Sequence, residues 1–166
     1  MIEIPLHTGL TAAIFAPFGA VIDRPAEPGT RKGFTDYLGS DRPDGTPAFH
    51  TNHMAPMALP MTLDVMERHP HTAQAFVPLD VSRYLVTVAP SDAQGAPDLA
   101  RMQAFVVPGS LGVIYGRNVW HAPAAVLDRH GSFAVLMWRV GGGEDDVFVD
   151  IDPVSLVTDC TTTTLA

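Results

Sequence analysis

The sequence Pro-Gly-Ser-Leu-Gly-Val-Ile-Tyr-Gly-Arg-Asn-Val-Trp-His-Ala-Pro, residues 108–123, alternates between turns and strands. It opens with a Pro-Gly turn dipeptide, and residues 113–115 are a β-branched and aromatic run typical of a strand. Residues 116–118 predict a second turn because Gly and Asn tolerate left-handed backbone. A second strand follows and ends before Pro123, so His121 lies where a small barrel would place a reactive group. The alternative is a core histidine bonded to a backbone carbonyl.

The composition favours one compact domain built from short strands. The chain has 166 residues, of which 46% are hydrophobic and 17% charged, and this is enough for a core of its own. Its 15 prolines and 14 glycines are spread without a repeat, which suits strands joined by turns. We therefore predict a single domain over residues 1–158 and a loose tail over residues 159–166, where four threonines run together.

The charge and the cysteine content exclude several classes of partner and site. The net charge is -8 and Lys32 is the sole lysine, which argues against binding to nucleic acid or to an anionic membrane surface. Cys160 stands alone, so the chain forms no internal disulfide or thiolate metal cage. The chain shows no signal peptide and no run long enough to span a bilayer, and a cytoplasmic location is the default expectation.

The remaining chain predicts many strands and little helix. Residues 1–5 predict an edge strand, residues 11–15 a short helix capped by Thr8 or Thr11, and residues 36–38 an extended segment. Residues 23–35 are rich in Pro, Gly and charge and predict a loop. Further strands are predicted over residues 20–22, 61–69, 74–79, 82–89, 104–107, 124–127, 132–140 and 147–151. Strands at this spacing imply a closed antiparallel barrel.

The strand predicted over residues 61–69 carries a carboxylate and an imidazole at its end. Strict alternation would place Glu67 and His69 on the same inward face as Leu63. A buried glutamate must be paired, hydrogen-bonded or neutral, and beside a histidine it suits acid/base or metal chemistry. The alternative is an outward-facing Glu67 that pairs with Arg68 or Arg83.

Other histidines allow a metal interpretation with less support from their spacing. His50 and His53 lie on opposite faces of the strand predicted over residues 49–54, and surface placement explains them equally well. His69 and His71 have His-x-His spacing, and Gln74 offers a third, oxygen ligand. A proline between the two histidines makes an uninterrupted strand improbable, so solvent exposure of His71 is the alternative.

Several short strings, in order, resemble the ureidoglycolate lyase family. They are Phe-Ala-Pro-Phe-Gly at 15–19, Leu-Pro-Met-Thr at 59–62, Glu-Arg-His-Pro at 67–70, Gln-Ala-Phe-Val-Pro-Leu at 74–79 and Arg-Asn-Val-Trp-His at 117–121. The resemblance covers residues 10–150 and is weak over residues 24–50. The stretch at 108–123 is also similar to the second motif of the cupin superfamily, in which a turn precedes an inward-pointing histidine.

The resemblance implies a fold, an activity and an assembly. The fold would be an all-β, cupin-like antiparallel barrel (jelly roll) with a short N-terminal helix. The activity would be cleavage of ureidoglycolate to glyoxylate and urea in allantoin and purine nitrogen catabolism, by a homodimer that holds a divalent metal such as Ni, Zn or Mn. The rival hypotheses are a non-catalytic cupin that binds a small carboxylate and another metal-dependent cupin enzyme.

Site roles follow from the resemblance and from the chemistry of carbinolamide cleavage, which needs a base, an acid and a group to hold the carboxylate. His121 is the predicted base because histidine titrates near working pH. The predicted catalytic residues are His121, His69 and Glu67; the predicted substrate-binding residues are Arg117, Gln74, Tyr115, Arg68 and His53; the predicted metal ligands are His69, Gln74 and His121.

The sequence departs from the family pattern at two positions. Ala122 stands where the family usually has a second histidine after Trp-His, and His53 stands where it often has an arginine. Arginine is a natural clamp for a substrate carboxylate. Arg117 is therefore the predicted carboxylate partner, since strand alternation turns Arg68 away from Glu67.

Overall fold

Strands make up most of the computed structural model, which describes residues 1–143 and 145–158. The tail predicted at 159–166, with Cys160, lies outside these described residues. The elements are β1 (Ile2–His7), α1 (Ala12–Phe15), β2 (Gly19–Ile22), β3 (Thr46–Met54), β4 (Met61–Arg68), β5 (Gln74–Pro78), β6 (Arg83–Ala89), β7 (Gln103–Pro108), β8 (Gly112–Tyr115), β9 (Trp120–His121), β10 (Ala125–Leu127), β11 (Gly131–Arg139) and β12 (Val147–Thr158), with 3₁₀ turns at Thr35–Tyr37, Leu99–Arg101 and Gly141–Gly143.

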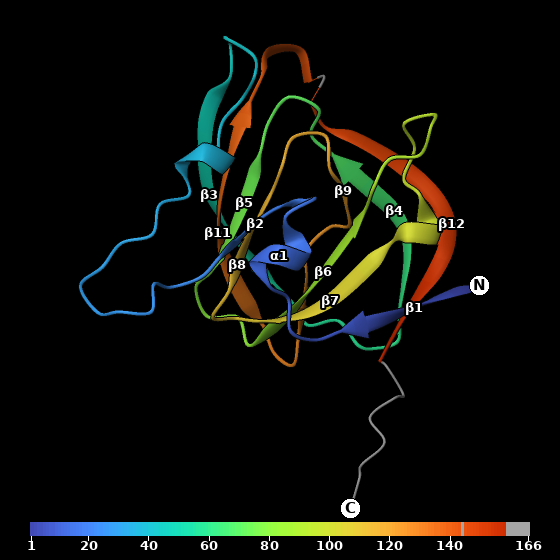
Figure 1. Ribbon diagram of the computed structural model, residues 1–166. Helices are drawn as coiled ribbons and strands as arrows, with labels where there is room; N and C mark the ends of the chain where they lie inside the picture. The colour runs from blue at the N-terminus through green and yellow to red at the C-terminus, as the bar shows by residue number, and fades with distance from the viewer. Residues whose placement is uncertain (144, 159–166) are drawn as a thin grey trace, which may run out of the picture.

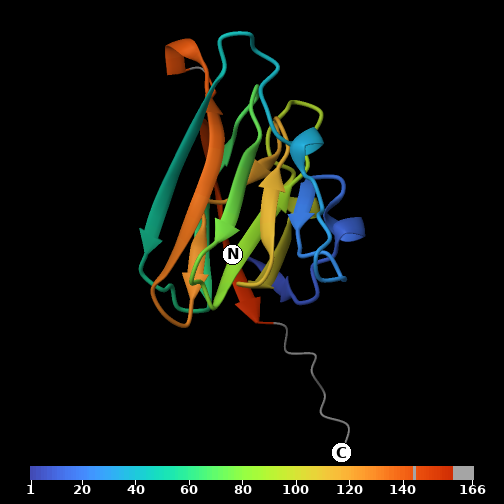
Figure 2. The same cartoon turned by 90° about the vertical axis from the view of Figure 1, so that its left-hand side faces the viewer.

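The described strands form two sheets, one of which closes on itself. The larger has the order β10-β6-β7-β1-β12-β4-β9, and an additional pairing of β6 with β9 closes a ring (Figure 1). The smaller has the order β2-β8-β5-β11-β3 and is seen face-on in Figure 2. The predicted all-β, cupin-like barrel with a short N-terminal helix is confirmed, although the closed sheet is mixed and not purely antiparallel.

The two sheets enclose two separate apolar cores. One core lies inside the closed ring, where Leu63, Met66, Trp120 and Leu156 pack together. The other lies between the ring and the smaller sheet, and Val86 of β6 meets Phe133 and Val135 of β11 there, with Phe15 of α1. Burial of these side chains is the main force holding each layer to the next.

Two local expectations were wrong. The N-terminal strand is not an edge strand, because β1 pairs in parallel with both β12 and β7, whereas the other described strand pairings are antiparallel. Residues 36–38 are not extended, because the amide of Tyr37 donates to the carbonyl of Phe34 at 3.1 Å and closes a 3₁₀ turn. The helix cap is confirmed, since Thr11 Oγ1 accepts from the amide of Ile14 at 3.3 Å.

Strand β4 does not keep the strict alternation that the sequence suggested. Leu63 and Met66 both point into the core of the ring, although alternation would send them to opposite faces. The partner strand β12 has a register shift between Asp150 and Val154, opposite this part of β4. Glu67 therefore faces the space between the sheets because of an irregular ladder, and not because it continues the face of Leu63.

The turns of the 108–123 stretch are those predicted. The amide of Gly109 donates to the carbonyl of Ser82 at 2.8 Å, and a Cβ at Gly109 would lie 1.8 Å from the carbonyl oxygen of Val81, so only glycine fits. Asn118 has a φ of 62°, in the left-handed region that asparagine tolerates. The β8–β9 turn thus places Tyr115 and His121 side by side at one end of the barrel.

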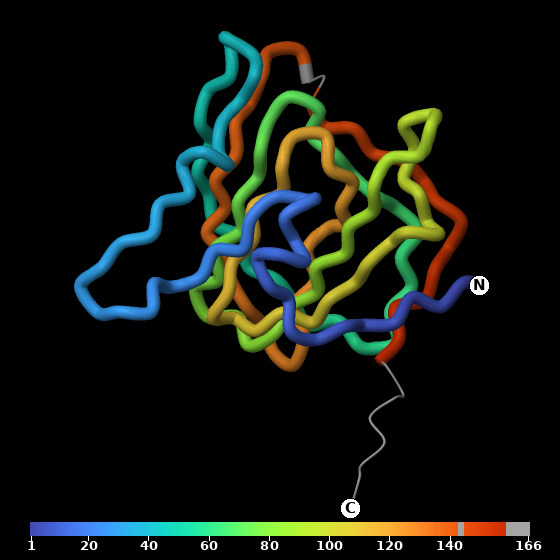
Figure 3. Tube along the Cα trace, in the orientation of Figure 1, coloured from blue at the N-terminus to red at the C-terminus, as the bar shows by residue number. Residues whose placement is uncertain are grey.

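The long loop over residues 23–34 leaves the barrel and returns to it (Figure 3). Where the loop returns, Phe34 at its end and Leu38 after it pack against Ala75 and Ile114 on the outer face of the smaller sheet. None of the described helices is both long and apolar enough to cross a bilayer.

Candidate functional site

Five polar side chains come together where β4, β5, β8 and β9 begin or end. The strands themselves can be followed in Figure 1. Glu67 lies near the end of β4, His69 just beyond it, Gln74 at the start of β5, Tyr115 at the end of β8 and His121 in β9. His69, Gln74 and His121 are buried, with 4%, 8% and 1% of their surfaces exposed. Direct pairing of Glu67 with His121 in the β4–β9 ladder brings the two halves of the site together.

His121 has one nitrogen committed to the backbone and one aimed at the cluster. Its Nδ1–H donates to the carbonyl of Val119 at 2.9 Å, so its Nε2 carries the lone pair in the neutral ring. That Nε2 lies 3.2 Å from Gln74 Oε1 and 3.5 Å from Glu67 Oε1. Tyr115 stacks flat on the imidazole, with 4.1 Å between ring centroids and 11° between planes, which fixes the ring orientation.

His69 is held in the same way from another loop. Its Nδ1 lies 3.1 Å from the carbonyl oxygen of Asp145 and 3.1 Å from Asp146 Oδ1. Its Nε2 is buried and has no hydrogen-bond partner among residues 1–143 and 145–158. The rings of His69 and His121 are 5.5 Å apart at their centroids. The Nε2 atoms of the two rings therefore belong to one cluster, in which that of His121 faces Gln74 and Glu67 and that of His69 has no hydrogen-bond partner among the described residues.

Burial sets the protonation of the cluster. Loss of hydration lowers the pKa of His121 to about 3, because an imidazolium would be poorly solvated there. Burial also raises the pKa of Glu67; positive charge on His69 opposes this rise and the Asp146 carboxylate adds to it. The pKa of Tyr115 is raised well above its ordinary value, so the phenol stays protonated. The site thus combines a neutral imidazole with a carboxyl group that holds its proton unusually well.

These donors fit a divalent cation. Ligand atoms of Glu67, His69 and His121 all lie within 4.8 Å of one another, and Gln74 Oε1 adjoins His121 Nε2. Lone pairs that face one another in a buried site need a cation or a hydrogen-bond donor between them. Two imidazole nitrogens with oxygen ligands suit Zn, Ni or Mn. The Nδ1 bonds to Val119 and Asp145 are the outer contacts that orient metal-binding histidines.

Comparison with known proteins agrees with this geometry. The ureidoglycolate lyase family model matches residues 3–158. The chain belongs to the ureidoglycolate lyase family. A ureidoglycolate lyase from Burkholderia cepacia is 40% identical over 136 residues, covering 76% of this chain and 75% of the relative. One from Schizosaccharomyces pombe is 32% identical over 170 residues, covering 82% and 85%. RmlC from Streptococcus suis, solved in complex with dTDP-D-xylose, is 12% identical with a TM-score of 0.43, covering 59% of this chain and 46% of RmlC.

The remaining residues predicted from the ureidoglycolate lyase resemblance lie at different distances from the cluster. Arg117 is exposed in the β8–β9 turn, between Tyr115 and His121 in the chain. Arg68 lies over the Trp120 ring at 4.4 Å, and its Nη1 donates to Gly95 at 3.0 Å, so it turns away from Glu67 as predicted. His53 is exposed on β3, opposite Ser132. Met137, which contacts Gln74, lies five residues after Ser132 in β11, so the two are about 17 Å apart along the strand. His53 is therefore remote from the cluster.

Sequence reasoning missed the residues that hold the histidines. Asp145 is 4% exposed; its carboxylate accepts from the amide of His71 at 2.6 Å and from Thr72 Oγ1 at 2.5 Å, while its carbonyl faces His69. His71 itself turns to Asp41, with 3.0 Å between Nδ1 and Oδ1, and does not join the cluster. The available signal was two consecutive aspartates, Asp145 and Asp146, shortly after three consecutive glycines.

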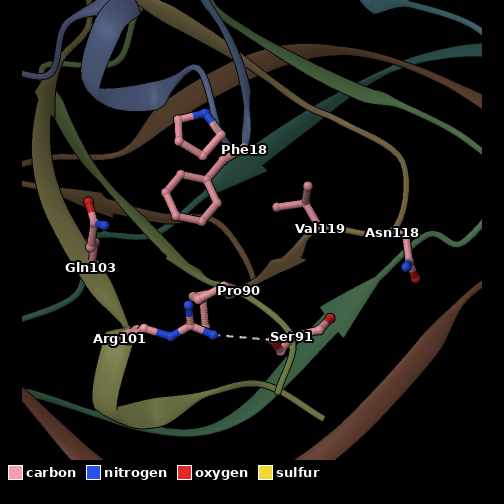
Figure 4. Close-up of a pocket in the computed structure, with 9 residues that line it drawn as sticks. Phe18, Pro90, Ser91, Arg101, Gln103, Asn118 and Val119 are labelled. Carbon is pink, nitrogen blue, oxygen red and sulfur yellow. Dashed lines mark hydrogen bonds between the residues drawn. The ribbon is translucent and has the colours of Figure 1, made fainter. Parts of the chain in front are cut away.

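Two hollows flank this end of the barrel. One, of about 220 Å³, is lined by Met137, Trp138, Arg139, Val140, Asp145 and Asp146, and so borders the groups that contact Gln74 and His69. The other, of about 410 Å³, lies across the β8–β9 turn between Phe18, Arg101, Gln103 and Val119 (Figure 4). In it, Arg101 is already paired with Asp98 at 2.7 Å. The larger hollow also borders the cluster, because its lining residues Asn118 and Val119 make backbone hydrogen bonds with His69 and His121.

Proposed function

We propose that the protein is a carbon–nitrogen lyase that cleaves ureidoglycolate to glyoxylate and urea. The observation that carries the proposal is the convergence of Glu67, His69, Gln74 and His121 on one buried point, in a chain that belongs to the ureidoglycolate lyase family. Allantoin and purine nitrogen catabolism is the proposed pathway, and a cytoplasmic location stays a prediction.

Cleavage moves one proton from the substrate hydroxyl to the departing urea nitrogen. As the O–H bond breaks, the carbonyl of glyoxylate forms, the C–N bond breaks and urea leaves. We assign the proton transfer to Glu67, because burial raises its pKa toward the range in which a carboxyl group both accepts and returns a proton. The prediction that His121 is the base is less well supported, since its pKa is lowered to about 3.

His121 and His69 serve better as fixed lone-pair groups. With Gln74 they would hold a divalent metal beside the Glu67 carboxyl group, and the metal would supply Lewis-acid stabilisation of the oxygen anion that develops on the substrate. Stacking on Tyr115 and the bond to Val119 keep the His121 ring in one orientation before substrate arrives. Gln74 and Tyr115 stay candidates for binding the ureido group, as the sequence predicts.

The test is incubation with racemic ureidoglycolate, with glyoxylate and urea measured separately and the spontaneous rate subtracted. Equal formation of both products supports the lyase. Binding of substrate without release of urea would indicate a non-catalytic carboxylate-binding cupin instead. Elemental analysis of untagged protein, with activity before and after dialysis against a chelator, tests the metal. Full activity with no metal detected would contradict the metal proposal.

The apolar outer face of the smaller sheet supports a homodimer. Phe49 of β3 is 72% exposed and Val77 of β5 is 39% exposed, and Leu136 of β11 lies next to Phe49 in the ladder. An apolar patch of this kind on a soluble domain is typical of an interface. Sedimentation should give a dimer at micromolar concentration, and Phe49→Glu should shift it toward monomer. A wild-type monomer would contradict the homodimer.

A further inference from the structure

The proposed reaction brings a carboxylate to an acidic end of the barrel. Glu67, Asp145 and Asp146 all lie around the histidine cluster. A substrate anion entering here meets negative charge unless a fixed cation offsets it. Arg68 cannot do so, because its guanidinium is held between the Trp120 ring and the carbonyl of Gly95. Besides the proposed metal, a side-chain cation that meets the substrate carboxylate would have to come from another strand or turn.

Strand β11 carries an arginine to the edge of the cluster. Met137 points between the sheets, where its sulfur lies 3.8 Å from Gln74 Nε2. Arg139 is two residues further along the same strand and therefore lies on the same face, one step nearer the solvent. Met137 and Arg139 line the hollow of about 220 Å³, together with Asp145 and Asp146, whose groups face His69.

The backbone of Arg139 is held in the sheet, whereas its guanidinium makes no ion pair with the described residues. Arg139 pairs with Thr46 in the β11–β3 ladder, and its carbonyl accepts from Thr46 Oγ1 at 3.4 Å. Its guanidinium has no ion-pair partner within residues 1–143 and 145–158. The hollow's carboxylates have other partners: Asp145 bonds to Thr72 and the His71 amide, and Asp146 faces His69.

We infer that Arg139 binds the carboxylate of the substrate in this hollow and so selects small substrates that carry a carboxylate; the inference rests on the proposed function. The five donors of a guanidinium suit a carboxylate held by two parallel bonds, a geometry that lysine does not reproduce. β5 lies between β8 and β11 in the smaller sheet, so Arg117 and Arg139 flank Gln74 from opposite sides. Arg117 lines neither of the two hollows.

The experiment compares Arg139→Ala and Arg139→Lys with Arg129→Ala as a matched control. Arg129 is an exposed arginine in the turn before β11, at the opposite end of that strand, and its loss changes the net charge equally. Loss of a carboxylate clamp should raise KM for ureidoglycolate tenfold or more and leave kcat within about threefold, since the contact is equally present in ground and transition states. Arg139→Lys should recover part of the loss, and Arg129→Ala should match wild type.

A binding measurement separates this inference from the proposed function. Glyoxylate and urea are each titrated into the metal-replete protein by calorimetry, which needs no turnover. Arg139→Ala should weaken glyoxylate binding tenfold or more and leave urea binding as it is. Unchanged KM and unchanged glyoxylate affinity in Arg139→Ala would overturn the clamp even if wild type makes urea. Absence of urea formation by wild type would reject the lyase, yet a glyoxylate affinity that depends on Arg139 would still support the clamp.

Discussion

Two pairs of histidines have almost the same ring spacing and opposite surroundings. His69 and His121 lie 5.5 Å apart at their centroids, with their planes at 45°, and both are buried. His53 and His130 lie 5.6 Å apart, stacked at 18°, and both are exposed. Proximity alone therefore does not mark a site in this protein.

The difference lies in what each pair's nitrogens contact. The buried pair has backbone carbonyls on both Nδ1 atoms and carboxyl and amide oxygens around His121 Nε2. In the exposed pair, the one hydrogen bond among the described residues joins His53 Nδ1 to the Ser132 hydroxyl at 2.9 Å. Orientation by the backbone and exclusion of water turn a histidine pair into a ligand set.

The largest effect is expected from breaking the buried pair. His121→Ala should lower turnover on the order of a hundredfold or more and release the metal, because loss of one nitrogen ligand leaves a sparse site. His130→Ala is the control from the exposed pair and should keep both activity and metal. Turnover assays and elemental analysis on the same preparations measure this. Retention of metal by the His121→Ala protein would assign His121 to another role.

Glu67→Gln sharpens the comparison by removing the proton carrier while keeping a side-chain oxygen at this position. Turnover should fall tenfold to about a hundredfold, because glutamine cannot accept the hydroxyl proton. The metal content should stay close to that of wild type, unlike in His121→Ala. A drop in metal that parallels the drop in turnover would show that Glu67 acts only as a ligand.

The pH dependence of stability should report the burial of His121. The pKa of His121 is about 3 in the folded protein and has its ordinary value of 6.5 in the unfolded chain, so protonation favours unfolding. The stability that neutral His121 contributes is therefore lost progressively as the pH falls below about 6.5. Between pH 7 and pH 5 the loss is about 2 kcal/mol, or roughly 4–8 °C in Tm. Glu67, whose folded pKa is raised, acts in the opposite sense, since its protonation favours the folded state as pH falls.

The thermal melts should therefore be made on metal-free Glu67→Gln protein, in which that opposing contribution is absent. Adding His121→Gln, which keeps a side-chain donor for the Val119 carbonyl, should flatten the fall in Tm between pH 7 and pH 5. Equal slopes with and without His121 would contradict the burial argument.

The smallest effect is expected at His53. It is exposed and about 17 Å along β11 from the residue that contacts Gln74, so His53→Ala should change the free energy of unfolding by less than about 0.5 kcal/mol. KM should stay within twofold, measured beside Arg117→Ala, which the sequence predicts to raise KM more than it lowers turnover. A large rise in KM for His53→Ala would restore it as a substrate-binding residue.

Local sequence rules predicted most elements and the residues of the cluster. The turns at Gly109 and Asn118 follow from residue chemistry, and Thr11 caps the helix as expected. The position of β1 was missed because parallel pairing between strands at the two ends of the chain leaves no local signal. The prediction that Glu67 faces inward was correct, but its reasoning from strict alternation was not. Glu67 reaches the cluster because the pairing of β4 with β12 is irregular, and the sequence of β4 does not reveal this irregularity.

The supports of the histidines could not be predicted from sequence for a related reason. The His121 contact uses the carbonyl of Val119, and any residue type would supply it. The His69 contact uses a loop that follows β11, and its partner Asp145 is 76 residues away in the chain. Backbone acceptors and long-range loops become visible only once the sheets are assembled.

The β8–β9 turn is hydrogen-bonded to both histidines of the cluster. The amide of Asn118 donates to the carbonyl of His69 at 2.7 Å, and the next residue, Val119, receives the Nδ1–H of His121. When the turn moves, both imidazoles move with it, so their displacements are correlated and the gap between them is preserved. The turn would then set the radius of any ion held between the two rings, and exchange of turn residues would alter that radius without altering either histidine.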